Sequence, residues 1–203
     1  IEEGEYSGDE EMFALIHAMR SRIVTAPCFN GDKVIGAILF ERTMDGEADG
    51  KPIPALLWER GVVPFLKVDK GLEAEADGVQ LMKPNADLDA LCERAVAKGV
   101  FGTKMRSVVN LANPVGVKAI VAQQFAEAAR IAAHGLMPII EPEVNIKSPE
   151  RDAADRLLLA ETLAALDAWT GAPVMLKLSL PTEAGLFQPL VDHPKVLRVV
   201  ALS

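Results

Sequence analysis

The feature that most constrains the fold is an alternation of short apolar segments with longer amphipathic ones. The short segments are apolar on both faces, which is typical of strands in a parallel sheet covered by helices. Glycine, proline and polar turn residues separate them from stretches with helical spacing of apolar positions. The expected strands are residues 34–40, 62–68, 100–106, 136–142, 174–180 and 196–202.

Helical segments occupy most of the sequence between these strands. Each has apolar positions on one side, and several have a polar cap residue before them or a glycine after them. One of them shows only an approximate capping box at Ser148. The expected helices are 7–23 with Ser7 as N-cap, 85–99, 114–134, 148–169 and 183–191.

An α/β chain of this kind can close in two ways, as an open doubly wound sheet or as a (β/α)8 TIM barrel. No G-x-G-x-x-G or P-loop follows any strand, which weakens the nucleotide-fold alternative. A complete barrel usually has roughly 250 residues. This chain has 203 residues, and it begins with a helix that no strand precedes. We therefore predict a single partial barrel domain over residues 1–203, with strands two to seven. The start without methionine and the strand-like end VLRVVALS predict a fragment of a longer chain.

Composition excludes several classes of partner. The net charge of -8 and the lack of a basic stripe argue against nucleic acid. No apolar run is long enough to span a membrane, and the acidic start is not a signal peptide. Cys28 and Cys92 suit no metal or redox spacing, which favours a reducing cytoplasm. We expect no metal and no cofactor; the oligomeric state stays open, a homo-oligomer included.

Charged residues gather near the carboxyl ends of successive expected strands, where barrel active sites are built. A lysine at a strand end often reaches solvent, and glutamates there can simply face water. Lys177 differs, because Leu176 and Leu178 flank it and lysine is rarely buried unless it is paired or functional. The residues that should converge are Lys67, Lys104, Arg106, Glu141, Glu143 and Lys177.

This set suits carbonyl chemistry. Desolvation and nearby ammonium groups disfavour the charged form of Lys177, so that part of it becomes a free amine. A free amine converts a ketone into an iminium, which is an electron sink for breaking the adjacent carbon–carbon bond. Glu141 or Glu143 can supply the acid that removes water. Lys104 adds a second cation, and Arg106 with Lys67 can bind a phosphate.

The motifs that carry this chemistry resemble those of the class I fructose-bisphosphate aldolases, particularly the shorter bacterial form. Their order and spacing agree with the family along the whole chain. They are GAILFERTMD (36–45), GVVPFLKVDKG (61–71), FGTKMR (101–106), GLMPIIEPEVN (135–145), MLKLSLP (175–181) and VVALS (199–203).

The resemblance implies reversible, metal-independent cleavage of fructose 1,6-bisphosphate into dihydroxyacetone phosphate and glyceraldehyde 3-phosphate, with phosphorylated ketoses and trioses as partners. The implied roles are Schiff-base lysine for Lys177, carbinolamine dehydration and proton transfer for Glu141 with Glu143 beside it, support of carbon–carbon cleavage for Lys104, phosphate binding for Arg106, lining of the site for Lys67, and one end of a second phosphate loop for Ser203.

The sequence also departs from the family pattern. The strand-one aspartate, the glycines after Ser203, and the serine and arginine of strand eight have no counterparts here. We therefore expect these 203 residues to be inactive when isolated.

Three other functions stay open. A transaldolase-like or dihydrodipicolinate-synthase-like lyase would keep Lys177, but Tyr6 is the only tyrosine for its site. A metal-dependent aldolase or isomerase could use Asp69, Glu141 and Glu143, although the three histidines are expected away from the strand ends. A non-catalytic scaffold is the third.

Overall fold

The computed structural model describes residue 4 and residues 6–202 of the chain. They form two compact units. Unit 1 comprises Ile1–Lys67 and Arg94–Phe101, and unit 2 comprises Val68–Glu93 and Gly102–Ser203.

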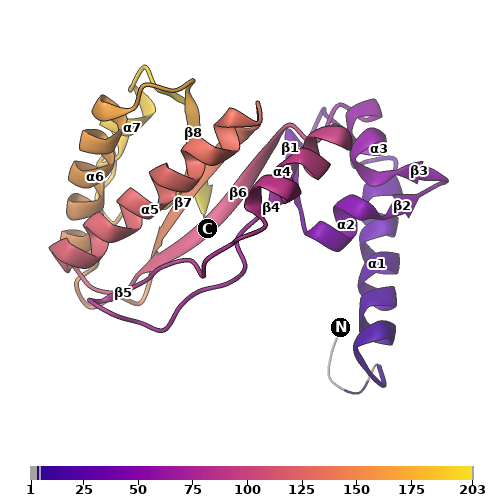
Figure 1. Ribbon diagram of the computed structural model, residues 1–203, viewed down its shortest axis with the longest axis horizontal. Helices are drawn as coiled ribbons and strands as arrows, with labels where there is room; N and C mark the ends of the chain where they lie inside the picture. Colours follow the sequence, from indigo (N-terminus) through magenta and orange to yellow (C-terminus); the bar gives the residue numbers. More distant parts are fainter. Residues whose placement is uncertain (1–3, 5, 203) are drawn as a thin grey trace. The chain divides into compact units, whose positions relative to one another are not determined.

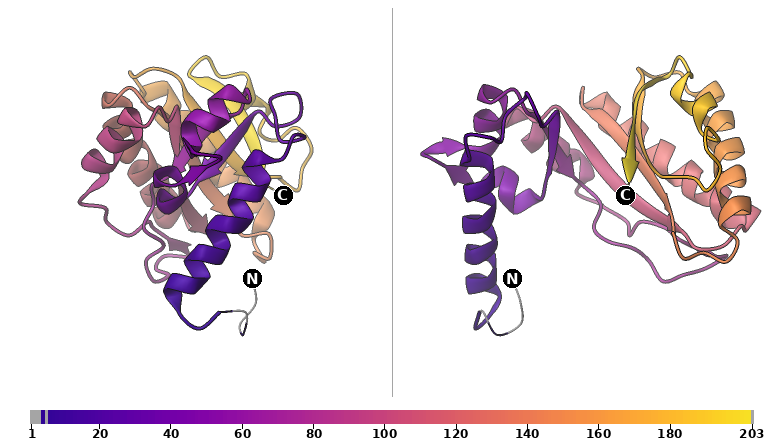
Figure 2. Two further views of the ribbon diagram at one scale, coloured as in Figure 1. Left: turned by 90° about the vertical axis from the view of Figure 1, so that its right-hand side faces the viewer. Right: turned by 180° about the vertical axis from the view of Figure 1, so that it is seen from behind.

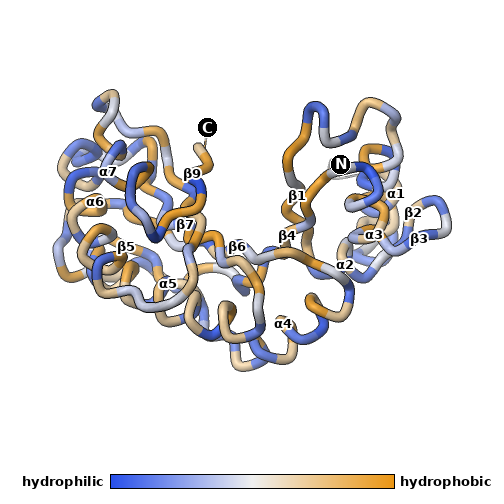
Figure 3. Tube along the Cα trace, turned by 90° about the horizontal axis from the view of Figure 1, so that it is seen from above, coloured by the Kyte–Doolittle hydropathy of each residue, from blue (hydrophilic) through white to orange (hydrophobic). Residues whose placement is uncertain are grey.

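Unit 1 contains one pair of parallel strands together with one long helix and two shorter helices (Figure 1). In the parallel pair, Gly36 lies opposite Val63, and both strands are predominantly hydrophobic along the tube in Figure 3. The elements are α1 (Asp9–Thr25), β1 (Gly36–Leu39), α2 (Glu41–Asp45), β2 (Glu47–Ala48), β3 (Lys51–Pro52), α3 (Ile53–Glu59) and β4 (Val63–Lys67).

Local sequence explains how unit 1 places Lys67. Helix α3 has Pro54 in its first turn, where a missing N–H costs nothing, and it is followed by Gly61 at φ 72°. This left-handed glycine turns the chain into β4, whose last residue is Lys67. The predicted cap of α1 is wrong: Gly8 is the N-cap, and Ser7 instead hydrogen-bonds the Glu11 carboxylate through its N–H and hydroxyl.

Unit 2 is a parallel sheet in the order β6, β7, β8 and β9, with short β5 antiparallel to β6. Helices α5 and α6 pack against one face of this sheet, as Figures 1 and 2 show. The elements are β5 (Val79–Gln80), α4 (Leu88–Ala97, shared with unit 1), β6 (Gly102–Val109), α5 (Pro114–Ala133), β7 (Met137–Val144), α6 (Arg151–Ala168), β8 (Val174–Ser179), α7 (Gln188–Val191) and β9 (Val196–Leu202).

Helix α5 shows why the sequence predicted the layers well. The Asn113 side chain caps it by accepting from the N–H groups of Val115 and Gly116 at 2.9 and 3.2 Å. Gly135 ends the helix region at φ 78° and leads into β7. Between these signals, the apolar side buries residues such as Ile120 and Phe125. Periodicity and caps therefore agree along its whole length.

The predicted fold class is confirmed. The six expected strands are β1, β4, β6, β7, β8 and β9, and every pairing described within the two units among them is parallel. With helices between successive strands, this is the organisation of part of a (β/α)8 barrel. Strands β6 and β7 run on to Val109 and Val144, beyond their expected ends. The short elements α2, α3, β2, β3 and β5 were not expected. Among the described residues, none of the helices combines the length and apolar character that crossing a bilayer requires.

Candidate active site

Neighbouring strands of unit 2 present charged side chains on one face of the sheet. In the register of β6 and β7, Arg106 lies opposite Glu141, and paired residues of parallel strands face the same side. Lys104 and Glu143, each two residues away along its strand, share that face. The pairing of Ile140 with Leu176 brings Lys177 of β8 onto it as well. Five of the six side chains predicted to converge therefore share one face of the unit 2 sheet, the exception being Lys67.

Glu141 lies between two lysines. Its Oε1 accepts a hydrogen bond from Lys177 Nζ, and Lys104 Nζ lies 2.8 Å from its Oε2. The second contact is an ion pair without hydrogen-bond geometry. The Glu141 side chain is 2% exposed, against 10% for Lys104 and 15% for Lys177. A single buried carboxylate thus contacts both ammonium groups.

The position of Lys177 follows from strand alternation. Leu176 and Leu178, its neighbours in sequence, are buried on the opposite face of β8, at 0% and 2% exposure. Lys177 therefore points to the face that carries Glu141, where it is partly buried. The face of β8 that the helices cover is apolar, and Lys177 is the charged residue on its other face. This explains how a lysine can occur within a hydrophobic strand.

Arg106 and Glu143 form a second, more exposed pair. Arg106 Nη1 donates to Glu143 Oε2 at 3.1 Å, and their side chains are 43% and 24% exposed. The chemistry of the residues alone left open whether Glu141 or Glu143 would serve Lys177, whereas the family resemblance implied Glu141. Glu141 contacts Lys177 in the structure, whereas Glu143 pairs with the arginine.

Two further residues, Lys67 and Ser203, were predicted for the site. Lys67 ends β4 in unit 1, where its Nζ lies 5.8 Å from the centroid of the Phe40 ring. Ser203 lies outside the described residues.

Ser179 is a buried residue whose part in this region the sequence did not indicate. The backbone ladder between β7 and β8 pairs Ile139 with Met175 and Ile140 with Leu176. Farther along, the Ser179 hydroxyl donates to Val144 O at 2.9 Å and accepts from Val144 N at 3.1 Å. These two bonds join the ends of β7 and β8 beyond the Lys177–Glu141 pair.

Gln124 supports the same strands from the opposite face. It is fully buried on α5, and its Nε2 donates to Ser107 Oγ at 2.9 Å and Met105 O at 3.2 Å. A longer contact of 3.4 Å reaches Glu141 O. The Gln124 side chain therefore connects β6 and β7 on the face opposite their charged residues. A polar residue on the apolar side of a helix is the sequence feature that could have indicated this role.

The loop after β8 is held by a buried ion pair at the start of α6. Arg151 Nε bonds both carboxylate oxygens of Asp155, at 3.1 and 3.0 Å. Arg151 also donates to Leu180 O, and Thr182 N donates to Asp155. Burial raises the pKa of Asp155, and the Arg151 hydrogen bond opposes this shift. The chain that leaves β8 near Lys177 is thus fixed to α6.

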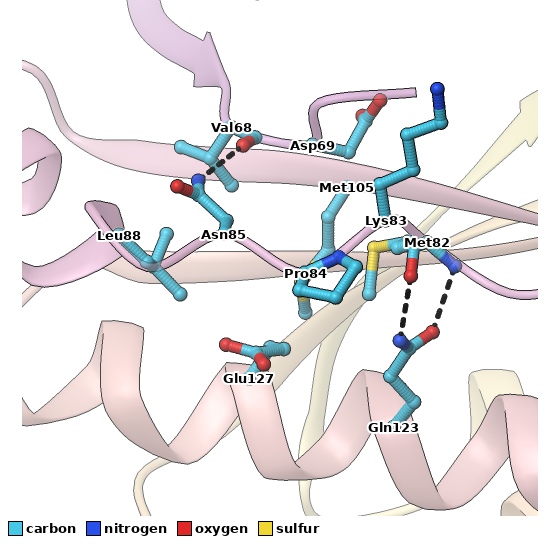
Figure 4. A pocket seen from close by; sticks show the side chains of 10 residues that line it. All are labelled: Val68, Asp69, Met82, Lys83, Pro84, Asn85, Leu88, Met105, Gln123 and Glu127. Atoms are coloured by element: carbon cyan, nitrogen blue, oxygen red, sulfur yellow. Dashed lines mark hydrogen bonds between the residues drawn. The ribbon is translucent and has the colours of Figure 1, made fainter. Parts of the chain in front are cut away.

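A small cavity of about 30 Å³ lies on the helix-covered side of unit 2, which is room for about one water molecule. Met82, Asn85, Met105, Gln123 and Glu127 are among the residues that line it (Figure 4). None of the charged strand residues lines it, although Asp69, which follows β4, does. Within the part of the chain that the structure describes, no group of three or more His, Cys, Asp or Glu side chains is arranged to hold a metal ion.

The structure thus places a lysine, a buried glutamate and a second lysine on consecutive parallel strands of a partial barrel. Comparison with known proteins identifies an enzyme family with this fold. The family model described as Fructose-bisphosphate aldolase class-I matches residues 14–165. The chain is 54% identical over 204 residues to Fructose-bisphosphate aldolase class 1 of Porphyromonas gingivalis, covering 100% of this chain and 69% of that protein.

A solved structure shows the same fold. It is the ternary co-crystal structure of fructose-bisphosphate aldolase from Plasmodium falciparum with TRAP and a small-molecule inhibitor, and the TM-score is 0.73 at 22% identity. The match covers 92% of this chain but only 62% of that one. The chain belongs to the class I fructose-bisphosphate aldolase family.

Proposed function

We propose that the protein to which this chain belongs reversibly cleaves fructose 1,6-bisphosphate to dihydroxyacetone phosphate and glyceraldehyde 3-phosphate through a Schiff base on Lys177. Family membership supports the reaction. The observation that carries the assignment of the residues is the position of Glu141, whose carboxylate contacts both Lys177 and Lys104.

The first half of the reaction uses the Lys177–Glu141 pair. Glu141 takes a proton from the Lys177 ammonium, and the free amine attacks the ketone carbon to form a carbinolamine. Glu141 then returns a proton to the carbinolamine hydroxyl, which leaves as water and produces the iminium. Because the carboxylate already touches the ammonium, neither transfer requires it to move far.

The second half breaks the carbon–carbon bond. The electron pair of that bond passes to the iminium and gives an enamine, while the hydroxyl proton of the departing carbon goes to a base and the aldehyde leaves. Lys104 stabilises the negative charge that develops on substrate oxygens near Glu141. Protonation of the enamine and hydrolysis of the resulting iminium release dihydroxyacetone phosphate and regenerate Lys177.

The remaining assignments complete the proposal. Arg106 is half exposed and can release Glu143 to bind a substrate phosphate, with Lys67 and Ser203 contributing to phosphate binding. Glu143 orients Arg106 through their ion pair. We propose one partial barrel domain over residues 1–203 and a cytoplasmic protein in glycolysis or gluconeogenesis.

Borohydride trapping tests the proposal on the full-length protein. With dihydroxyacetone phosphate present, reduction should fix a three-carbon phosphate adduct on Lys177, located by peptide mass spectrometry. Lys177→Met should abolish it, whereas Lys118→Met, at an exposed position of α5, should not. EDTA should leave cleavage unchanged. Activity without an adduct and with sensitivity to chelator would contradict the Schiff-base assignment.

A further inference from the structure

Asp69 is fixed alongside β6 within unit 2. The N–H of Val68 donates to Lys104 O at 3.0 Å, and the Asp69 carboxylate accepts the N–H of Arg106 at 3.2 Å. The Asp69 side chain is 3% exposed. Figure 4 shows its carboxylate directed away from Gln123 and Glu127 of α5. The carboxylate is therefore buried and held by backbone contacts to the stretch of β6 that carries Lys104 and Arg106.

The same carboxylate faces the Lys104 ammonium. Asp69 Oδ2 lies 3.8 Å from Lys104 Nζ, which in turn lies 2.8 Å from Glu141 Oε2. Lys177 contacts the other oxygen of Glu141. The four side chains make a row of alternating charge in the order Asp69, Lys104, Glu141 and Lys177. Two carboxylates balance two ammonium groups in a region where all four are at most 15% exposed.

We infer that Asp69 is a positioning residue that holds Lys104 at one oxygen of Glu141 and leaves the other oxygen to Lys177. The inference rests on the proposed function and extends it. Without the charge of Asp69, Glu141 alone would balance two ammonium groups in a poorly solvated site. Lys104 would then compete for the carboxylate that exchanges protons with Lys177, and its own placement beside the substrate would loosen.

The substitution Asp69→Asn tests this role in the full-length enzyme, because the amide oxygen can still accept the Arg106 N–H. We expect kcat for cleavage to fall by about 10- to 100-fold, the scale for a catalytic group that is slightly misplaced, with a smaller change in KM. The matched control is Asp77→Asn, at an exposed turn residue with φ 50°, a conformation that asparagine tolerates. The control should keep wild-type kinetics.

A double-mutant cycle separates positioning from a structural role. If Asp69 acts through Lys104, the double variant Asp69→Asn/Lys104→Met should have a kcat within about twofold of Lys104→Met alone. Losses that multiply, or an Asp69→Asn enzyme within about twofold of wild type, would overturn the inference.

Two further measurements keep the result interpretable. An unfolding curve is measured for each variant. If Asp69→Asn does not fold, Asp69→Glu replaces it in the cycle. Its effect on kcat is likewise expected to disappear when Lys104 is already methionine. Adduct formation on Lys177 of the wild-type enzyme is measured in parallel. Its absence would reject the proposed function, whereas its presence with a failed cycle would reject only the role of Asp69.

Discussion

Ser179 and Val144 are joined by two hydrogen bonds through a single hydroxyl, which donates to the Val144 carbonyl and accepts from its N–H. Both residues are buried, at 2% and 1% exposure. The bonds connect β7 and β8 past the end of their backbone ladder. Because Glu141 and Lys177 lie between the ladder and this link, the spacing of the pair is fixed from both sides.

The substitution Ser179→Ala should therefore affect both stability and chemistry. It leaves the buried N–H and carbonyl of Val144 without these partners, which should cost about 1–3 kcal/mol of unfolding free energy. We also expect slower trapping of the Lys177 adduct. Urea unfolding and timed borohydride quenching measure the two effects. Ser179→Thr keeps the hydroxyl and should retain more of both, so equal losses in the two variants would argue against the hydrogen bonds as the cause.

The two glutamates of β7 should respond very differently to conversion to glutamine. Glu141→Gln removes the proton carrier of Lys177 and should lower kcat by about 10²- to 10⁴-fold. It also leaves two partly buried ammonium groups without their shared carboxylate, which should cost about 3 kcal/mol of stability. Glu143→Gln breaks a half-exposed ion pair, and its stability cost should stay below about 1 kcal/mol. Single-turnover kinetics and unfolding curves are measured for both variants. A larger loss of kcat in Glu143→Gln than in Glu141→Gln would contradict the assignment of Glu141 as the proton carrier.

The substitution Gln124→Leu tests whether support from α5 reaches the charged face of the sheet. It removes the bonds from Nε2 to Ser107 and Met105 while keeping the side chain similar in size. We expect a loss of about 1–2 kcal/mol and a lower kcat. Gln123→Leu is the control, because Gln123 bonds both backbone groups of Met82 instead (Figure 4). Gln123→Leu should destabilise the chain but lower kcat less than Gln124→Leu does. If Gln123→Leu lowered kcat more, Gln124 would not be the residue that supports the charged face.

The two cysteines should differ in reactivity for a physical reason. Burial raises the pKa of the Cys92 thiol to about 11, whereas Cys28 is exposed. Because the thiolate is the nucleophile, iodoacetamide at pH 8 should modify Cys28 and spare Cys92 until the chain is unfolded. Peptide mass spectrometry gives the extent at each position, and rapid modification of folded Cys92 would contradict its burial.

The same shift has a consequence for stability. The folded chain disfavours the ionised Cys92 thiolate, so the neutral thiol adds to the free energy of unfolding below its ordinary pKa of 9.0. This contribution is lost as the pH rises from 9.0 to about 11. Cys92→Ala should flatten this part of the pH dependence of unfolding.

Much of the fold was readable from local sequence. The six strands were predicted within a few residues because apolar runs and turn residues are short-range signals, and α5 carries both its cap and its terminating glycine. The elements that were missed, such as α2 (five residues), α3 (seven residues) and the two-residue β5, are too short for a periodicity to appear. Lys177 stood out because the residues around it in the strand are apolar.

Local sequence was thus enough to predict the order of the longer elements, the class of sheet and the charged residues at the strand ends. The fold was needed to show that the Glu141 carboxylate contacts Lys177 while Glu143 pairs with Arg106, that Asp69 faces Lys104, and that Ser179 and Gln124 fix the strands from either side. These contacts join residues 17 to 37 positions apart in the chain. They depend on strand register and on side-chain reach of a few ångströms, which no local pattern encodes.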